Sequence, residues 1–203
     1  MRGKELQFVM EPKCVCVYAA SADALEPVYT EAARQLGCCI AQHGYSLCYG
    51  AGALGLMGEL ARAVHETEKA KVIGVIPEAL NEPHIAYNLC DELHVTETMR
   101  QRKQMMEDMS CAFIALPGGF GTLEELLEII TLKQLRYHSK PVVILNVNGF
   151  YDEMIAFFNK CIQTGMAAAW AGSLYWVAQT PEQALSYIEE YTVPALPDKV
   201  QKA

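Results

Sequence analysis

The sequence has few basic residues, no long apolar run and no cysteine pattern typical of a metal or redox site. Its 203 residues include 16 Lys and Arg against 24 Asp and Glu, a net charge of −8. This balance argues against a general nucleic-acid binder, because phosphate backbones attract basic surfaces. No apolar run reaches the roughly 18 to 20 residues of a membrane span. Residues 1–13 lack the apolar core of a secretory signal, so a cytoplasmic protein is expected.

The eight cysteines form neither a C-x-x-C pair nor a Cys/His cluster with zinc spacing. Four of them, at positions 14, 16, 48 and 111, lie in or beside apolar runs. We therefore expect buried free thiols that pack as small apolar residues, with a disulfide or metal role as the alternative. No metal and no cofactor is expected. A net negative charge still permits a local positive site for a small anion.

Short apolar or β-branched runs alternate along the chain with longer segments of helical periodicity. The composition, 52% hydrophobic and 20% charged residues, is that of a packed chain. The runs are 13–19, 46–50, 71–77, 92–97, 111–118, 141–146 and 174–179, and the helical segments are 24–42, 56–69, 98–109, 122–137, 151–163 and 181–191.

Most of the runs are continuously apolar, which is typical of strands buried on both faces. Their alternation with helices predicts an α/β fold with a doubly wound, mainly parallel sheet and helices on both faces. A chain of this length fits roughly one domain. We therefore expect a single domain over 1–203, with a core of about 13–191 and loose ends at 1–12 and 194–203.

Ligands of such folds bind at the carboxyl ends of the strands, so the turns that enter helices deserve scrutiny. The turn after run 46–50 contains Gly50-x-Gly52-x-x-Gly55, the spacing of a dinucleotide fingerprint. The acidic residue expected at the end of the next strand is missing, which disfavours NAD. A close helix–strand turn and a nucleotide-contacting loop both stay open for this segment.

The turn after run 111–118 is more specific. Gly118, Gly119 and Gly121 leave a bare backbone whose N–H groups can converge on an anion, beside the positive end of the following helix. Thr122 can cap that helix or donate to a phosphate oxygen. A tight turn is the alternative to a phosphate cradle. No Gly-Lys-Ser/Thr follows, which excludes a Walker loop.

Two cations lie on an apolar helix face in segment 98–109. Thr98 and Gln101 have the spacing of a capping box. Met99, Arg102, Lys103 and Met106 then share one face. A buried cation needs an anionic partner, which Glu125, a substrate phosphate or both could supply. The alternative is that the cations extend along the rim to solvent. The two methionines could pack a base or the core.

Glu125 shares the flank of its helix with Ile129 and Leu132, so we expect it to be partly shielded from water, whereas Glu124 and Glu128 are expected nearer to solvent. An adjacent Arg102 would lower the pKa of the Glu125 carboxyl by about 1 to 3 units and hold it ionised.

Together these residues resemble the LONELY GUY (LOG) family of nucleoside 5′-monophosphate phosphoribohydrolases, whose members are often labelled lysine decarboxylases. The family motif P-G-G-x-G-T-x-x-E and the preceding M-x-x-R-K are both present. They are met by Pro117, Gly118, Gly119, Gly121, Thr122 and Glu125, and by Met99, Arg102 and Lys103. The resemblance extends over about 13–191.

The resemblance implies a Rossmann-like fold, a homodimer and hydrolysis of the N-glycosidic bond of cytokinin riboside 5′-monophosphates or AMP, without a cofactor. Arg102 and Glu125 would be the catalytic pair. The substrate-binding residues would be Met99, Lys103, Gly118, Gly119, Phe120, Gly121, Thr122, Glu124 and Thr131.

The sequence departs from the family at Gly50-Ala51-Gly52, at Ala19-Ala20-Ser21 and at Leu132, and in the loop 78–88, where Glu78 and Glu82 are candidate substrate contacts. These departures bear on the preferred base. A non-catalytic carrier of a phosphorylated nucleotide-like ligand and a hydrolase of another phosphoribosyl compound are the alternative functions.

Overall fold

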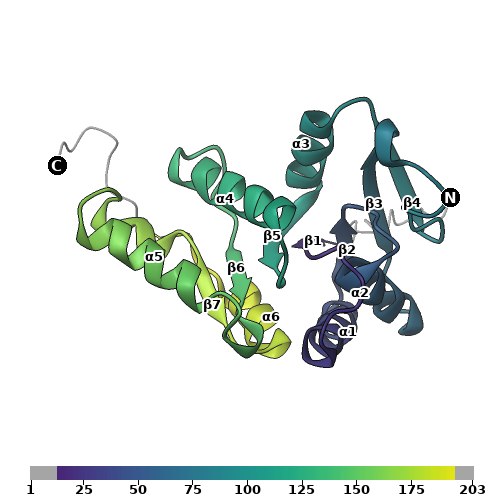
Figure 1. Ribbon diagram of the computed structural model, residues 1–203, viewed down its shortest axis with the longest axis horizontal. Helices are drawn as coiled ribbons and strands as arrows, with labels where there is room; N and C mark the ends of the chain where they lie inside the picture. The colour runs from purple at the N-terminus through teal and green to yellow at the C-terminus, as the bar shows by residue number, and fades with distance from the viewer. Residues whose placement is uncertain (1–12, 195–203) are drawn as a thin grey trace, which may run out of the picture.

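Seven parallel strands form one sheet in the order β4-β3-β2-β1-β5-β6-β7 (Figure 1). The computed structural model describes residues 13–194, so the loose ends expected at 1–12 and 194–203 fall, apart from residue 194, outside the described residues. The strands are β1 (Cys14–Tyr18), β2 (Ser46–Tyr49), β3 (Val72–Pro77), β4 (Glu92–Thr96), β5 (Ser110–Ala115), β6 (Val142–Leu145) and β7 (Trp176–Ala178).

Six α-helices connect and follow these strands. They are α1 (Pro27–Gln42), α2 (Gly55–Glu66), α3 (Met99–Met109), α4 (Phe120–Gln134), α5 (Asp152–Gln163) and α6 (Pro181–Glu190). The α/β prediction is confirmed, and each predicted strand and helix is present with ends displaced by a few residues. The sheet is parallel throughout its pairings.

The order of the strands reverses beside the central strand β1. From β1 the chain moves outward to β2, β3 and β4, and α3 then carries it back to β5 on the other side of β1. Helices α1, α2 and α6 cover one face of the sheet, and α3, α4 and α5 cover the other (Figure 1). This reversal is the place where α/β sheets of this kind open a crevice for a ligand.

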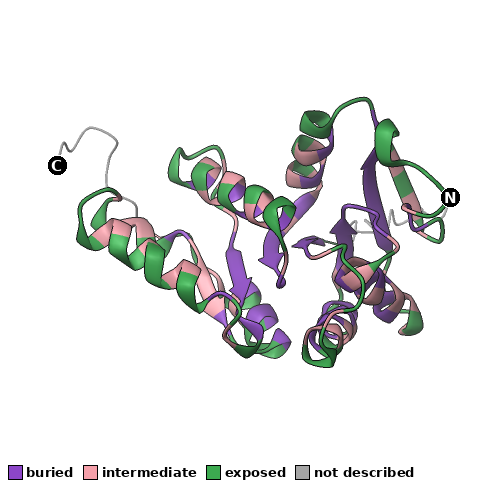
Figure 2. Ribbon diagram, viewed as in Figure 1, coloured by how far each residue is buried: buried purple, intermediate pink, exposed green. Residues whose placement is uncertain are grey.

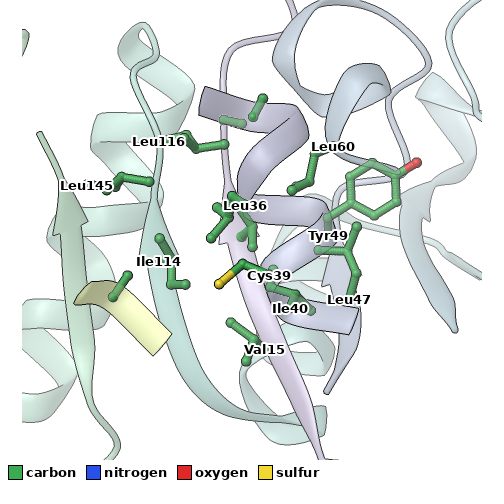
Figure 3. Packing of buried hydrophobic residues seen from close by; sticks show 14 of the residues in the cluster. Val15, Leu36, Cys39, Ile40, Leu47, Tyr49, Leu60, Ile114, Leu116 and Leu145 are labelled. Atoms are coloured by element: carbon green, nitrogen blue, oxygen red, sulfur yellow. The ribbon is translucent and has the colours of Figure 1, made fainter. Parts of the chain in front are cut away.

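The core follows the alternation of side chains along each strand. On the α1 face, Leu36 and Ile40 pack toward Val15 of β1 and Ile114 of β5 (Figure 3). On the other face, Cys16 and Phe113 belong to a second cluster. All of β1, β2, β3 and β6 is buried (Figure 2).

Strand β4 is partly exposed on one face. Leu93 and Val95 point to that face and are 37% and 45% exposed, because β4 lies at the edge of the sheet, beyond the cover of α2. The cysteines at 14, 16, 39 and 48 are buried and the others are half-buried, including Cys111, for which burial was expected; all eight are free thiols. Among the described residues, no helix is long and apolar enough to cross a membrane.

Candidate active site

A cavity of about 560 Å³ opens at the carboxyl ends of β1, β2 and β3, beside the turn that follows β5. The exit of β1, the turn after β2, the loop after β3 and the first turns of α3 and α4 all contribute to its wall. The cavity therefore lies at the reversal of strand order, where the topology predicts a ligand.

Arg102 reaches this cavity from the first turn of α3. Thr98 accepts a hydrogen bond from the Gln101 N–H and the Gln101 side chain accepts from the Thr98 N–H, so the predicted capping box is confirmed. The cap fixes the start of α3 and so directs the Arg102 side chain toward the carboxyl end of β3. The Arg102 Nε donates to the Val75 carbonyl at 3.1 Å, which holds the guanidinium plane.

The Arg102 guanidinium is paired with the Glu125 carboxylate. Nη1 of Arg102 donates to Oε1 of Glu125 at 2.9 Å, and the two side chains are only 11% and 12% exposed. The anionic partner predicted for the buried cation is therefore present, and an extended position along the rim is wrong for Arg102. Since both charges are largely removed from water, their mutual contact and hydrogen bonds stabilise each other's charged form.

Burial raises the pKa of the Glu125 carboxyl above its ordinary 4.5, although Arg102 opposes the rise. Arg102 lowers the pKa as expected, but removing the carboxylate from water outweighs the contact with one cation, so the net shift is upward. Burial also raises the pKa of Tyr18, and the nearby negative charge of Glu125 adds to the rise. Tyr18 thus remains a neutral phenol beside the carboxylate.

Helix α4 begins at the cavity without a side-chain cap. Gly119 is the N-cap and Phe120 the first helical residue, so the expected cap at Thr122 is wrong. The first intrahelical bond runs from the Leu123 N–H to the Gly119 carbonyl. The N–H groups of Phe120, Gly121 and Thr122 precede that bond and are free of helical partners. They lie where an anion would be stabilised by the helix dipole.

The glycines of this turn serve two different purposes. A side chain at Gly118 would overlap with Thr122, so packing requires glycine there. A Cβ at Gly119 or Gly121 would meet no protein atom within 4 Å. The fold therefore leaves open space at Gly119 and Gly121, both of which line the cavity.

The glycines of the turn after β2 also serve different purposes. A side chain at Gly50 would overlap with the Arg102 guanidinium, so Gly50 makes room for the ion pair. Gly55 has φ +58° and lies against the backbone of Ser21 and Ala22. Its N–H donates to Asp23, and the Met57 N–H donates to the Ala20 carbonyl. The start of α2 is thus already bonded, so Gly55 makes a close turn, whereas Gly50 and Gly52 line the cavity.

Most of the predicted site residues line this one cavity: Met99, Arg102, Gly119, Phe120, Gly121, Thr122, Glu124 and Glu125. Three do not. Gly118 lies behind Thr122. Lys103 turns to the acids of α4, with Nζ 2.5 Å from Glu124 and 2.7 Å from Glu128. Thr131 lies further along α4 and donates to the Leu127 carbonyl.

Several lining residues were not singled out from the sequence. Tyr18, Met57 and Ile76 give the cavity an apolar floor, and Leu80 and Ile85 come from the loop after β3. Glu78 and Glu82, the acids suggested in that loop, are exposed. Met106 is buried in the core, whereas Met99 is 42% exposed at the cavity. The alternation along β1, which places Tyr18 on the same face as Cys16, could have indicated Tyr18.

A parallel sheet with a glycine-bordered, uncapped helix start at its reversal defines a Rossmann-like protein of the kind that binds phosphorylated ligands. Comparison with known proteins gives a consistent picture. The family model described as "Possible lysine decarboxylase" matches residues 57–188. The chain belongs to this family, and within it to the LOG family.

The chain is 41% identical over 188 residues to the cytokinin riboside 5′-monophosphate phosphoribohydrolase LOG2 of Arabidopsis thaliana, covering 93% of this chain and 87% of that protein. It is 42% identical over 177 residues to LOG of Oryza sativa subsp. japonica, covering 87% and 73%. Among solved structures, the molybdenum cofactor binding protein of Rippkaea orientalis has a TM-score of 0.67 at 24% identity, covering 89% of this chain and 97% of that chain. That likeness concerns the fold alone.

Proposed function

We propose that the protein hydrolyses the N-glycosidic bond of nucleoside 5′-monophosphates, either cytokinin riboside 5′-monophosphates or AMP, to free base and ribose 5-phosphate. The observation that carries this proposal is the shielded Arg102–Glu125 pair, 2.9 Å apart, in a cavity that also contains the free N-terminus of α4. LOG relatives named for this activity add support.

The reaction passes through a ribose with positive charge at C1′. The phosphate would bind the N–H groups at the start of α4 and so position C1′ through remote binding energy. The Glu125 carboxylate would stabilise the charge at C1′ and accept a proton from water as the water oxygen bonds to that carbon. The C1′–N bond breaks with its electron pair on the base nitrogen, which takes a proton from solvent, and Glu125 returns the proton from water to solvent. Arg102 would fix the position of the carboxylate and keep it charged.

The decarboxylase label requires a different chemistry. Lysine decarboxylation needs pyridoxal phosphate held on a lysine amine as a Schiff base. Among the described residues that line this cavity none is a lysine, and the nearby Lys103 amine is engaged by Glu124 and Glu128. The residues at this site therefore do not fit that cofactor.

The direct test is incubation of the protein with AMP, with isopentenyladenosine monophosphate and with adenosine, followed by chromatography of the products. We expect free base and ribose 5-phosphate from one or both monophosphates and little release from adenosine, which lacks the phosphate. Binding of a monophosphate without release of base would contradict the proposal and favour a carrier. Release of base from another phosphoribosyl compound alone would reassign the substrate.

Activity should decline at acidic pH with a midpoint above 4.5. The reason is that burial raises the pKa of Glu125 above 4.5, and a general base must be deprotonated to act. The anionic phosphate of a bound substrate would raise this pKa further. The measurement is kcat at saturating AMP between about pH 4 and 8. A loss of kcat at acidic pH with a midpoint at or below 4.5 would contradict the role of Glu125 as the general base.

Gly121→Ala should weaken substrate binding without harming the fold. The added Cβ meets no protein atom and enters the cavity beside the free N–H groups of α4. We expect KM for AMP to rise about tenfold, equivalent to about 1.4 kcal/mol, while the thermal midpoint is unchanged or higher. Gly118→Ala is the contrasting variant, since its Cβ overlaps with Thr122 and should lower stability. An unaltered KM in Gly121→Ala would argue against a phosphate at this turn.

We further propose a homodimer that uses α5. No residue of this 12-residue helix is fully buried, although its sequence is amphipathic (Figure 2). Phe157 is 61% exposed on it. A second copy would cover this apolar surface. Phe157→Asp should shift the molecular mass measured by light scattering toward that of a monomer, whereas Asn159→Asp, at an exposed position on the opposite side of the helix, should not. A wild-type monomer would contradict the proposal.

A further inference from the structure

A second cavity, of about 360 Å³, lies at the opposite end of α4 from the candidate active site. It is bounded by Lys133 in the last turn of α4, by the turn 136–139 and by the segment that follows α6. Lys133 is eight residues beyond Glu125, which corresponds to about 12 Å along the helix. The two cavities share no lining residue.

Two polar groups in this cavity are buried without a hydrogen-bond partner. Lys133 is only 2% exposed, and its Nζ makes no hydrogen bond among the described residues. The Nζ lies 4.9 Å from the centre of the Tyr191 ring, a cation–π contact. The Tyr191 hydroxyl is likewise buried and unpartnered. Such groups are rare in folded proteins, since an unmade hydrogen bond to a buried ammonium is costly.

The neighbouring groups do not supply the missing acceptor. His138 is fully engaged: a ring nitrogen bonds to the Ile129 carbonyl and the other to the Lys140 N–H, and burial lowers its pKa, so it remains neutral. None of the described residues that line the cavity is acidic. Tyr137, Val193 and Pro194 form an apolar wall.

We propose that this cavity is a second ligand site, in which the Lys133 ammonium and the Tyr191 hydroxyl bind the carboxylate or phosphate group of a small organic anion. An ammonium offers only donors, so the ligand group must be an acceptor, and a charged donor beside a hydroxyl donor matches an anion. The volume is at the lower end of small-molecule sites, which limits the ligand to a compact body resting on the apolar wall.

The ionisation of Lys133 should respond to a bound anion. Burial alone lowers the pKa of its amine to about 8. A bound anion would favour the charged amine, so binding should take up protons near this pH and weaken as the pH rises above about 8. Tyr191, whose pKa is raised to about 12 by burial, stays a neutral donor throughout that range.

The experiment measures the reactivity of the Lys133 amine itself, so that an anion at the first cavity is not mistaken for one here. The full-length protein is acetylated with limiting acetic anhydride, with and without benzoate or inorganic phosphate, and labelling at each lysine is read by peptide mass spectrometry. We expect saturable slowing at Lys133, by tenfold or more, and none at the exposed Lys69. Protection by benzoate alone would assign a carboxylate ligand, and protection by phosphate alone a phosphorylated one.

Variants give an independent measure. Whichever of benzoate and phosphate protects Lys133 should also raise the thermal midpoint of the wild type and of Lys69→Met. The rise should be smaller in Lys133→Met, which lacks the proposed site. Tyr191→Phe, which keeps the ring, should weaken protection of Lys133 severalfold. Turnover of AMP should be unchanged in Lys133→Met, which separates this site from the proposed hydrolysis. Absence of protection of Lys133 by both probes would overturn the proposal.

Discussion

Glu125→Gln is expected to reduce kcat for release of base by at least about 100-fold, the lower end of what a general base contributes. The amide keeps the size of the side chain, and its oxygen can still accept from Nη1 of Arg102, 2.9 Å away in the wild type. The amide can neither take a proton from water nor stabilise the positive charge at C1′ with a negative charge. The dissociation constant for AMP, measured by calorimetry on the inactive variant, should change little.

Glu128→Gln is the matched control for this variant. Glu128 lies on the same helix and also pairs with a cation, Lys103, but it does not line the cavity. Its kcat should stay close to that of the wild type. Near-normal turnover in Glu125→Gln, or equal losses in both variants, would show that the role assigned to Glu125 is wrong.

Lys133→Met is expected to raise the free energy of unfolding at pH 7 by up to about 3 kcal/mol. The pKa of this buried amine is about 8 in the folded protein against 10.5 for an ordinary lysine, and each pKa unit corresponds to about 1.4 kcal/mol. The unfolded chain binds the proton more tightly, so Lys133 opposes folding fully below pH 8. As the pH rises from about 8 to 10.5 the wild type gains this stability back.

The difference between variant and wild type should therefore shrink with rising pH and vanish above about 10.5. Urea unfolding at neutral and alkaline pH, in buffers free of phosphate and carboxylate, measures it. Lys69→Met, in an exposed turn, should match the wild type at every pH. A variant that is less stable than the wild type at pH 7 would mean that the amine has a favourable partner in solution.

Much of the sheet and the burial of a cation in α3 could be predicted from local patterns. Continuous apolar runs such as Val72–Pro77 mark strands covered on both faces, and Thr98 with Gln101 marks a helix start. The need for an anionic partner of Arg102 followed from a cation on an apolar helix face, with Glu125 as one of the candidates, and the structure pairs the two. These inferences needed only short-range periodicity and the high free energy of an unpaired buried charge.

Features that depend on distant packing were missed. Nothing local to Gly50 indicates that Arg102 passes over it. The direction of the Glu125 pKa shift depends on how deeply the carboxyl is buried, which a sequence does not reveal. Lys133 lies in an otherwise ordinary helical segment, and its isolation results from the segment after α6 folding over it. In each case the deciding neighbour is remote along the chain.

The strand order also has a consequence for the newly made chain. Strand β1 pairs with β2 early, but its other edge waits for β5, so that Val17 meets Ile114 only after β2, β3, β4 and α3 have been synthesised. Such distant pairing slows folding. Until it forms, a nascent chain would expose an unpaired apolar strand edge that can recruit other chains. Chaperone demand and aggregation should therefore peak for ribosome-bound chains that end just before β5.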